Sequence, residues 1–127
     1  MQKTSGAFSL AARARSFKHA LRGIACMLRG QVNARIHAAL SLLVVGLGLY
    51  LGLSVVEWCF VVVAIAIVWM AEAFNTAIEL VCDLASPEFH PLVKQAKDIA
   101  AGAVLLAAIG AAMIGLVVFL PYLLALI

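Results

Sequence analysis

Three long stretches without a charged residue restrict the possible folds of this chain more than any other feature. Residues 99–127 form an uncharged run of 29 residues and residues 38–56 one of 19, whereas about 20 apolar residues are enough to cross a bilayer as a helix. A third run, 58–71, has 14 residues, but the helical spacing of apolar residues continues beyond it. With 66% hydrophobic residues, the sequence predicts a single all-α integral membrane domain with transmembrane helices at 36–56, 57–83 and 99–121.

The segment before the first span, residues 8–35, has the pattern of a helix that lies on the membrane surface. Apolar residues recur on one stripe of this helix and basic residues gather on another part of it (Phe17, Leu21, Ile24 and Leu28; Arg15, Lys18, Arg22 and Arg29). Such a helix either only anchors the chain or also presents its basic face to a ligand, and the residues leave both open. A cleaved signal peptide is not expected, because the first long apolar run begins only at Ala38.

The distribution of Lys and Arg predicts the orientation of the chain in the membrane. All nine lie either before the first span or in the 84–98 connection, at Lys94 and Lys97. Because positively charged loops stay in the cytoplasm, we expect the N-terminus and the 84–98 connection there, and the C-terminus outside. The net charge of +3 favours anionic lipid headgroups or a polyanion such as a nucleotide. No pattern of basic and aromatic residues indicates a nucleic-acid partner.

Polar residues interrupt the second span, in the stretch MAEAFNTAIELVCDLASPEFHPLVKQAKD (70–98). On a helix, five of them fall within an arc of about 100° and form one polar stripe: Glu72, Asn75, Thr76, Glu79 and Asp83. A charged group in the middle of a bilayer costs about 3 kcal/mol or more, so such residues are candidates for function. The alternative is that the stripe only joins helices, but three acids are a costly way to do so. Since three spans enclose a site poorly, we expect a homo-oligomer.

The positions along the polar stripe suggest separate roles. Glu79 and Asp83 lie near the cytoplasmic end, where carboxylate oxygens suit Mg²⁺ together with water and substrate phosphates. Glu72 lies about 16 Å deeper than Asp83, and a base at that depth suits an alcohol that belongs to a lipid. Lys97 is expected to neutralise phosphate charge, whereas Lys94 is explained more simply as a lysine that reaches for the membrane surface.

The segments EAFNTAIELVCDL, SPEFHPLVKQAKDIAAGAVLL and NARIH together resemble the small prokaryotic diacylglycerol kinase family, which includes the undecaprenol kinases, from about Phe17 to Pro121. The resemblance implies a homotrimer in the bacterial inner membrane, with an N-terminal surface helix, three spans and active sites at subunit interfaces. It also implies ATP- and Mg²⁺-dependent phosphorylation of a lipid alcohol. The segments RIH and EFHPLVKQAKD look closer to the undecaprenol kinases than to the diacylglycerol-specific enzymes.

By motif position, the resemblance makes Glu72 the catalytic base and Glu79 a metal-binding acid. It implies that the nucleotide site is lined by Asn75, Glu79, Asp83, Glu88, Phe89, His90, Lys97 and Asp98. The chain departs from the family at Gln31, where a second metal-binding Glu is common. An amide keeps an oxygen for Mg²⁺ but lacks the negative charge, so Gln31 is a candidate ligand of metal and nucleotide with a weaker attraction for the ion.

Two other classes of function fit the stripe less fully. A small oligomeric transporter or proton channel would use the acids as a relay, but this leaves KQAKD (94–98) and the basic helix unexplained. A scaffold without catalysis would use the acids only as contacts between helices. The sequence therefore predicts a lipid kinase that converts undecaprenol to undecaprenyl phosphate, with diacylglycerol as the alternative substrate.

Overall fold

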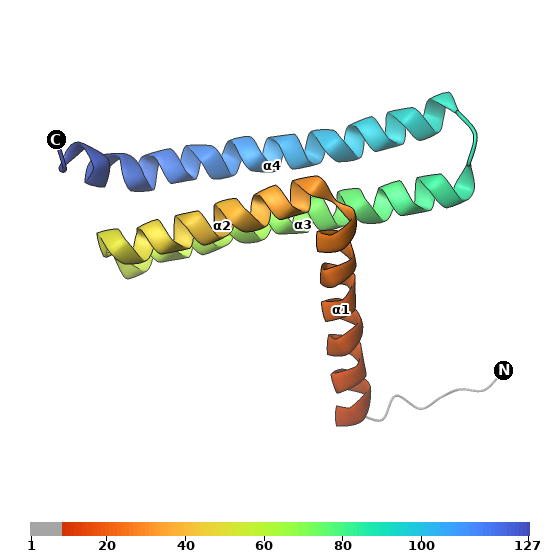
Figure 1. Ribbon diagram of the computed structural model, residues 1–127, viewed down its shortest axis with the longest axis horizontal. Coiled ribbons are helices and arrows are strands. Elements are labelled where there is room, and N and C mark those ends of the chain that lie inside the picture. Colours follow the sequence, from red (N-terminus) through yellow and green to blue (C-terminus); the bar gives the residue numbers. More distant parts are fainter. Residues whose placement is uncertain (1–8) are drawn as a thin grey trace.

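Four helices make up the computed structural model, which describes residues 9–127. They are α1 (Leu10–Gly30), α2 (Val32–Leu51), α3 (Val55–Ala85) and α4 (Pro91–Leu124). Helices α2, α3 and α4 run side by side, and α1 projects away from them (Figure 1). The last three helices are long and apolar enough to cross a membrane. The predicted all-helical fold with three candidate spans is therefore confirmed.

Local sequence explains where the helices begin and end. Ser9 accepts a hydrogen bond from the Ala12 N–H at the start of α1 (3.3 Å), and Ser54 forms a reciprocal capping box with Glu57 at the start of α3. Gly52 ends α2 with a φ of 70°, a conformation that glycine adopts without steric cost. Pro91 opens α4, where a missing N–H breaks no helical hydrogen bond.

The chain changes direction between α1 and α2 at Gln31, whose backbone is extended (φ −112°, ψ 124°). Its N–H bonds to the Met27 carbonyl (2.9 Å) and ends α1, and Val32 already belongs to α2. The helix α1 thus ends at Gly30, within the segment 8–35 that the sequence assigns to the membrane surface. Apolar residues keep their helical spacing across this junction, and no proline interrupts it. Gly30 is therefore the one residue whose type indicates that a helix ends here. Where α2 enters the membrane stays a prediction.

The apolar core lies at the end of the bundle where α2 turns into α3. Its buried cluster consists of Leu53, Val61, Val118 and Phe119. At the same end Tyr122 donates a hydrogen bond to Glu57 Oε2 (2.7 Å), which links α4 to α3. Elsewhere the three long helices expose many large apolar side chains, as expected where lipid or a neighbouring subunit replaces water.

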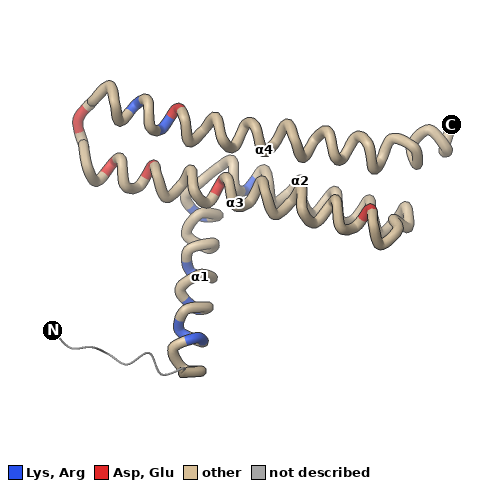
Figure 2. The backbone as a smooth tube through the Cα atoms, turned by 180° about the vertical axis from the view of Figure 1, so that it is seen from behind, with Lys and Arg blue, Asp and Glu red and all other residues tan. Residues whose placement is uncertain are grey.

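Charged residues gather toward the opposite end (Figure 2). In the described part of the chain, Lys and Arg lie on α1, at the start of α2 and in the first turns of α4, and all acids except Glu57 lie from the middle of α3 to the start of α4. Helices α3 and α4 have 31 and 34 residues. At 1.5 Å per residue they exceed the roughly 30 Å of a bilayer's hydrocarbon core, so their charged ends extend past it.

Candidate functional site

The inner part of the polar stripe of α3 is buried within the chain itself. Glu72, Asn75 and Thr76 have 1%, 5% and 9% of their surface exposed. They therefore share the face of α3 that packs against the other helices, as their spacing predicts. Asp83, at the end of the stripe, is exposed. The stripe thus runs from a buried carboxylate to a solvated one along a single helix.

Glu79 accepts hydrogen bonds from two side-chain amides. Gln31 Nε2 lies 3.0 Å from Glu79 Oε2, and Asn75 Nδ2 lies 3.2 Å from Glu79 Oε1. The extended backbone of Gln31 places its side chain at the junction of α1 and α2, within reach of α3. The structure therefore brings three of the predicted site residues into one cluster.

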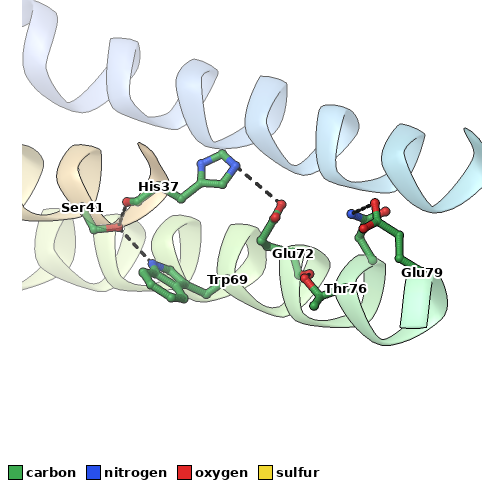
Figure 3. A network of polar contacts seen from close by, with 7 residues as sticks. His37, Ser41, Trp69, Glu72, Thr76 and Glu79 are labelled. Atoms are coloured by element: carbon green, nitrogen blue, oxygen red, sulfur yellow. Dashed lines mark hydrogen bonds and ion pairs between the residues drawn. The ribbon is translucent and has the colours of Figure 1, made fainter. Parts of the chain in front are cut away.

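His37 on α2 and Glu72 on α3 point toward one another (Figure 3). Nε2 of His37 lies 3.9 Å from Glu72 Oε2, and the two side chains are 16% and 1% exposed. Within residues 9–127, neither carboxylate oxygen of Glu72 accepts a hydrogen bond. Buried polar groups almost always have such partners. Among the described side chains, His37 is therefore the only one that makes a polar contact with the Glu72 carboxylate.

Further hydrogen bonds surround the pair of His37 and Glu72. Ser41 Oγ donates to the His37 carbonyl (2.7 Å) and accepts from Trp69 Nε1 on α3 (3.0 Å). Thr76 Oγ1 donates to the Glu72 carbonyl (2.9 Å). The bond between Ser41 and Trp69 joins α2 to α3, so it fixes how far one helix can slide along the other (Figure 3).

Two ion pairs lie at the charged end of the bundle. Lys97 Nζ is 2.5 Å from Asp83 Oδ1, and Lys94 Nζ is 2.5 Å from Asp98 Oδ2. The hydrogen bond to Asp83 raises the pKa of Lys97, which precedes the expected third span, so its ammonium stays charged. Lys97 therefore meets the end of the polar stripe, whereas Asp98 pairs with Lys94, one helical turn away on α4.

Glu88, Phe89 and His90 lie in the turn between α3 and α4, and all three are exposed. His90 caps α4, because its Nδ1 accepts a hydrogen bond from the Leu92 N–H (3.2 Å). Among residues 9–127, no hydrogen bond or ion pair joins these three side chains to the polar stripe. Their place in a nucleotide site stays a prediction.

Glu79 and Gln31 are the side chains that best fit a metal ion. In the described part of the chain, no three His, Cys, Asp or Glu residues cluster as metal ligands. Mg²⁺ does not require such a cluster, because it commonly takes one or two protein oxygens and completes its shell with water and phosphates. Glu79 offers a carboxylate, and the Gln31 amide offers its oxygen once it turns over. This donor set fits Mg²⁺ that arrives with a nucleotide.

An apolar cavity of about 250 Å³ lies between α2, α3 and α4, next to His37. Small residues of α4, including Ala108, Ala111 and Gly115, leave this space open, and aliphatic side chains form most of its wall. His37 and Ser41 are its polar lining residues. His37, which faces Glu72, thus borders a space that an apolar molecule can enter.

His37 is the site residue that sequence reasoning missed. It lies 35 positions before Glu72, so no helical spacing connects the two residues. A signal was nevertheless present, since a titratable side chain at the start of an apolar span is itself a candidate for function.

Known proteins of one family are similar to this chain over most of its length. The family model described as prokaryotic diacylglycerol kinase matches residues 18–119. An undecaprenol kinase of Bacillus subtilis is 43% identical over 107 residues, which cover 84% of this chain and 87% of the relative. A diacylglycerol kinase of Synechocystis is 39% identical over 112 residues, which cover 87% of this chain and 64% of the relative. A diacylglycerol kinase of Helicobacter pylori is 29% identical over 106 residues, or 78% of this chain and 83% of the relative.

Proposed function

The chain belongs to the prokaryotic diacylglycerol kinase family, and from this membership we infer that it is a membrane lipid kinase. We propose that it transfers the γ-phosphoryl group of ATP to the hydroxyl of undecaprenol. The identity to the undecaprenol kinase of Bacillus subtilis supports this substrate, together with the RIH segment at residues 35–37. Diacylglycerol is the second candidate, because the chain is also similar to diacylglycerol kinases.

The buried carboxylate of Glu72 is the observation that supports lipid phosphorylation most directly. It lies in the middle of a helix that is long enough to span the membrane and is 1% exposed. A base at this position reaches a hydroxyl that stays in the bilayer with its lipid tail. Glu72 therefore accepts the proton of the lipid alcohol, which is general-base catalysis.

The residues between Glu72 and the charged end handle the nucleotide. Glu79 and Gln31 hold Mg²⁺, and Asn75 keeps the Glu79 carboxylate in place through its amide. The ion neutralises phosphate charge when it is bound with ATP. Lys97 supplies a further positive charge at the phosphates. The remaining nucleotide contacts come from Asp83, Glu88, Phe89, His90 and Asp98.

The reaction transfers one proton to Glu72 and one phosphoryl group to the lipid alcohol. The O–H bond of the lipid alcohol breaks, and its proton passes to Glu72. The alcohol oxygen bonds to the γ-phosphorus, while the bond from that phosphorus to the bridging oxygen breaks. The electron pair of the broken bond stays on the β-phosphate of ADP. The products are a lipid phosphate and ADP.

The assembly and orientation are also part of the proposal. The three long helices expose many large apolar side chains, which leaves wide surfaces for lipid and for neighbouring subunits. Because the sequence resembles a family of homotrimers, we propose a homotrimer. In residues 9–127, Lys and Arg lie on α1, at the start of α2 and in the first turns of α4, away from the end where α2 turns into α3. This distribution supports a cytoplasmic site in the inner membrane, with α1 on the inner membrane surface and the C-terminus outside.

A phosphoryl-transfer assay tests the function. Purified protein in lipid bilayers receives ATP labelled at the γ-phosphate, Mg²⁺ and either undecaprenol or diacylglycerol at equal mole fraction. A clearly higher kcat/KM for undecaprenol than for diacylglycerol would confirm the proposed substrate. Faster labelling of phosphatidic acid would assign the chain to diacylglycerol instead. Labelling of neither lipid would refute a lipid kinase of these two kinds.

A further inference from the structure

The pair formed by His37 and Glu72 carries an inference that goes beyond the proposed function and rests on it. Glu72 is 1% exposed, and within residues 9–127 no side chain or backbone N–H donates a hydrogen bond to its carboxylate. The titratable groups that act on it are His37 from α2 and Glu79 from α3. On α4, the charged residues lie only in the first turns, at Lys94, Lys97 and Asp98.

Glu79 does not help Glu72 to carry a negative charge, because the two groups have the same sign. It is also already engaged by the amides of Gln31 and Asn75. His37 is the group that can supply the opposite charge, since its Nε2 lies 3.9 Å from Glu72 Oε2. An ionised carboxylate in a dry site is costly unless a positive charge or hydrogen-bond donors face it.

We propose that His37 is a positioning residue for the lipid kinase reaction: its imidazolium keeps Glu72 ionised and aimed at the lipid hydroxyl. Glu72 is then free to accept the proton of the alcohol during transfer. His37 itself touches neither lipid nor nucleotide in this scheme and acts through Glu72.

The surroundings of His37 fit this role. Its backbone carbonyl accepts from Ser41, which also bonds to Trp69 of α3, so the imidazole cannot easily move along α3. The side chain is 16% exposed and borders the cavity of about 250 Å³. An apolar cavity of about 150 Å³ is large enough for benzene in other proteins. A small ring can therefore enter here when the His37 side chain is removed.

Chemical rescue tests the proposal. We expect His37→Ala to lower kcat by about 100-fold, at the low end of the range for general acid–base groups, while the KM for ATP changes by less than about twofold. Added imidazole is expected to restore kcat at least about tenfold, because it returns a cation beside Glu72. Pyrrole has a ring of similar size but no basic nitrogen, so it is expected to restore nothing.

Two further variants separate this role from packing. His37→Gln keeps a hydrogen-bond donor but cannot be protonated at neutral pH, so its kcat is also expected to fall by about 100-fold. It also tests the proposal if His37→Ala does not fold. Leu40→Ala changes the same cavity wall and leaves Glu72 and the bonds of Ser41 in place, and its kcat is expected to stay within about threefold of wild type.

The outcomes distinguish this inference from the proposed function. If the wild-type protein labels neither lipid, the lipid kinase assignment fails and the role of His37 fails with it. If the wild type is active and both His37 variants keep kcat within about threefold, only the role of His37 is wrong. Equal effects of imidazole and pyrrole on His37→Ala would also overturn it, because the defect would then be one of packing.

Discussion

Lys97 Nζ lies 2.5 Å from Asp83 Oδ1, and this contact ties the end of α3 to the start of α4 across 14 positions of the chain. Both side chains are partly open to water, with 36% and 65% of their surface exposed. Solvent screens such pairs, so their contribution to stability is small. The contact is better understood as one that holds a cation at the mouth of the proposed nucleotide site.

Lys97→Ala should therefore reduce activity much more than stability. We expect kcat/KM for ATP to fall by about 100-fold, as when one group that stabilises transition-state charge is removed, with little change in the thermal midpoint. Lys94→Ala is the matched control, because Lys94 pairs with Asp98 rather than with the stripe. Steady-state kinetics and thermal unfolding in the same detergent measure both effects. Similar losses in the two variants would mean that Lys97 has no special role.

Glu72→Gln should lower turnover strongly while it changes stability little. The amide cannot accept the proton of the alcohol, so kcat is expected to fall by at least about 100-fold. The same change loses no hydrogen bond to the carboxylate among residues 9–127, but it leaves His37 facing a neutral amide instead of a charge, so the free energy of unfolding is expected to change little. Turnover assays and the oligomeric state by size-exclusion chromatography measure the two expectations.

The opposite result for Glu72→Gln has a clear meaning. If the stripe only joins helices, the variant should weaken the oligomer. Near-normal turnover would exclude Glu72 as the base.

Gly48→Ala should destabilise the bundle at the end away from the site. A Cβ at Gly48 would lie 2.9 Å from Cη2 of Trp58, and such overpacking costs about 1–3 kcal/mol. A Cβ at Gly46, on the same helix, meets no atom within 4 Å, so Gly46→Ala is the matched control and should be nearly neutral. Unfolding curves in detergent measure the difference. Equal stability of the two variants would show that Trp58 moves aside freely.

The sequence predicts those features of this protein that depend on helical periodicity alone. Glu72, Asn75 and Thr76 share a buried face because their spacing sets their angles around α3, whatever the helix packs against. The three candidate spans follow equally directly from the uncharged runs. Both predictions use only neighbours in the sequence.

Other features depend on how the helices pack, and the sequence does not contain that information locally. His37 meets Glu72 only because α2 and α3 pack in one particular register, which the bond between Ser41 and Trp69 helps to fix. Likewise Tyr122 reaches Glu57 across 65 positions of the chain. The break at Gln31 is a third case, because only Gly30 marks it locally.

Gln31→Glu tests whether the cluster around Glu79 binds the metal ion. Gln31 Nε2 now donates to Glu79 Oε2 (3.0 Å), and the variant would place a second carboxylate there. Without metal the two like charges repel each other, so thermal stability in EDTA should fall. With Mg²⁺ the added charge attracts the ion, and the Mg²⁺ concentration for half-maximal activity is expected to fall by about tenfold.

The control for this experiment is Gln31→Met, which keeps the length of the side chain but offers no oxygen to the ion. It should not lower the Mg²⁺ requirement, and it loses the hydrogen bond to Glu79 as Gln31→Glu does. The comparison therefore separates the effect of charge from the loss of that bond. If both variants give the wild-type Mg²⁺ titration, Gln31 does not face the metal, and Glu79 together with the phosphates of ATP must hold the ion.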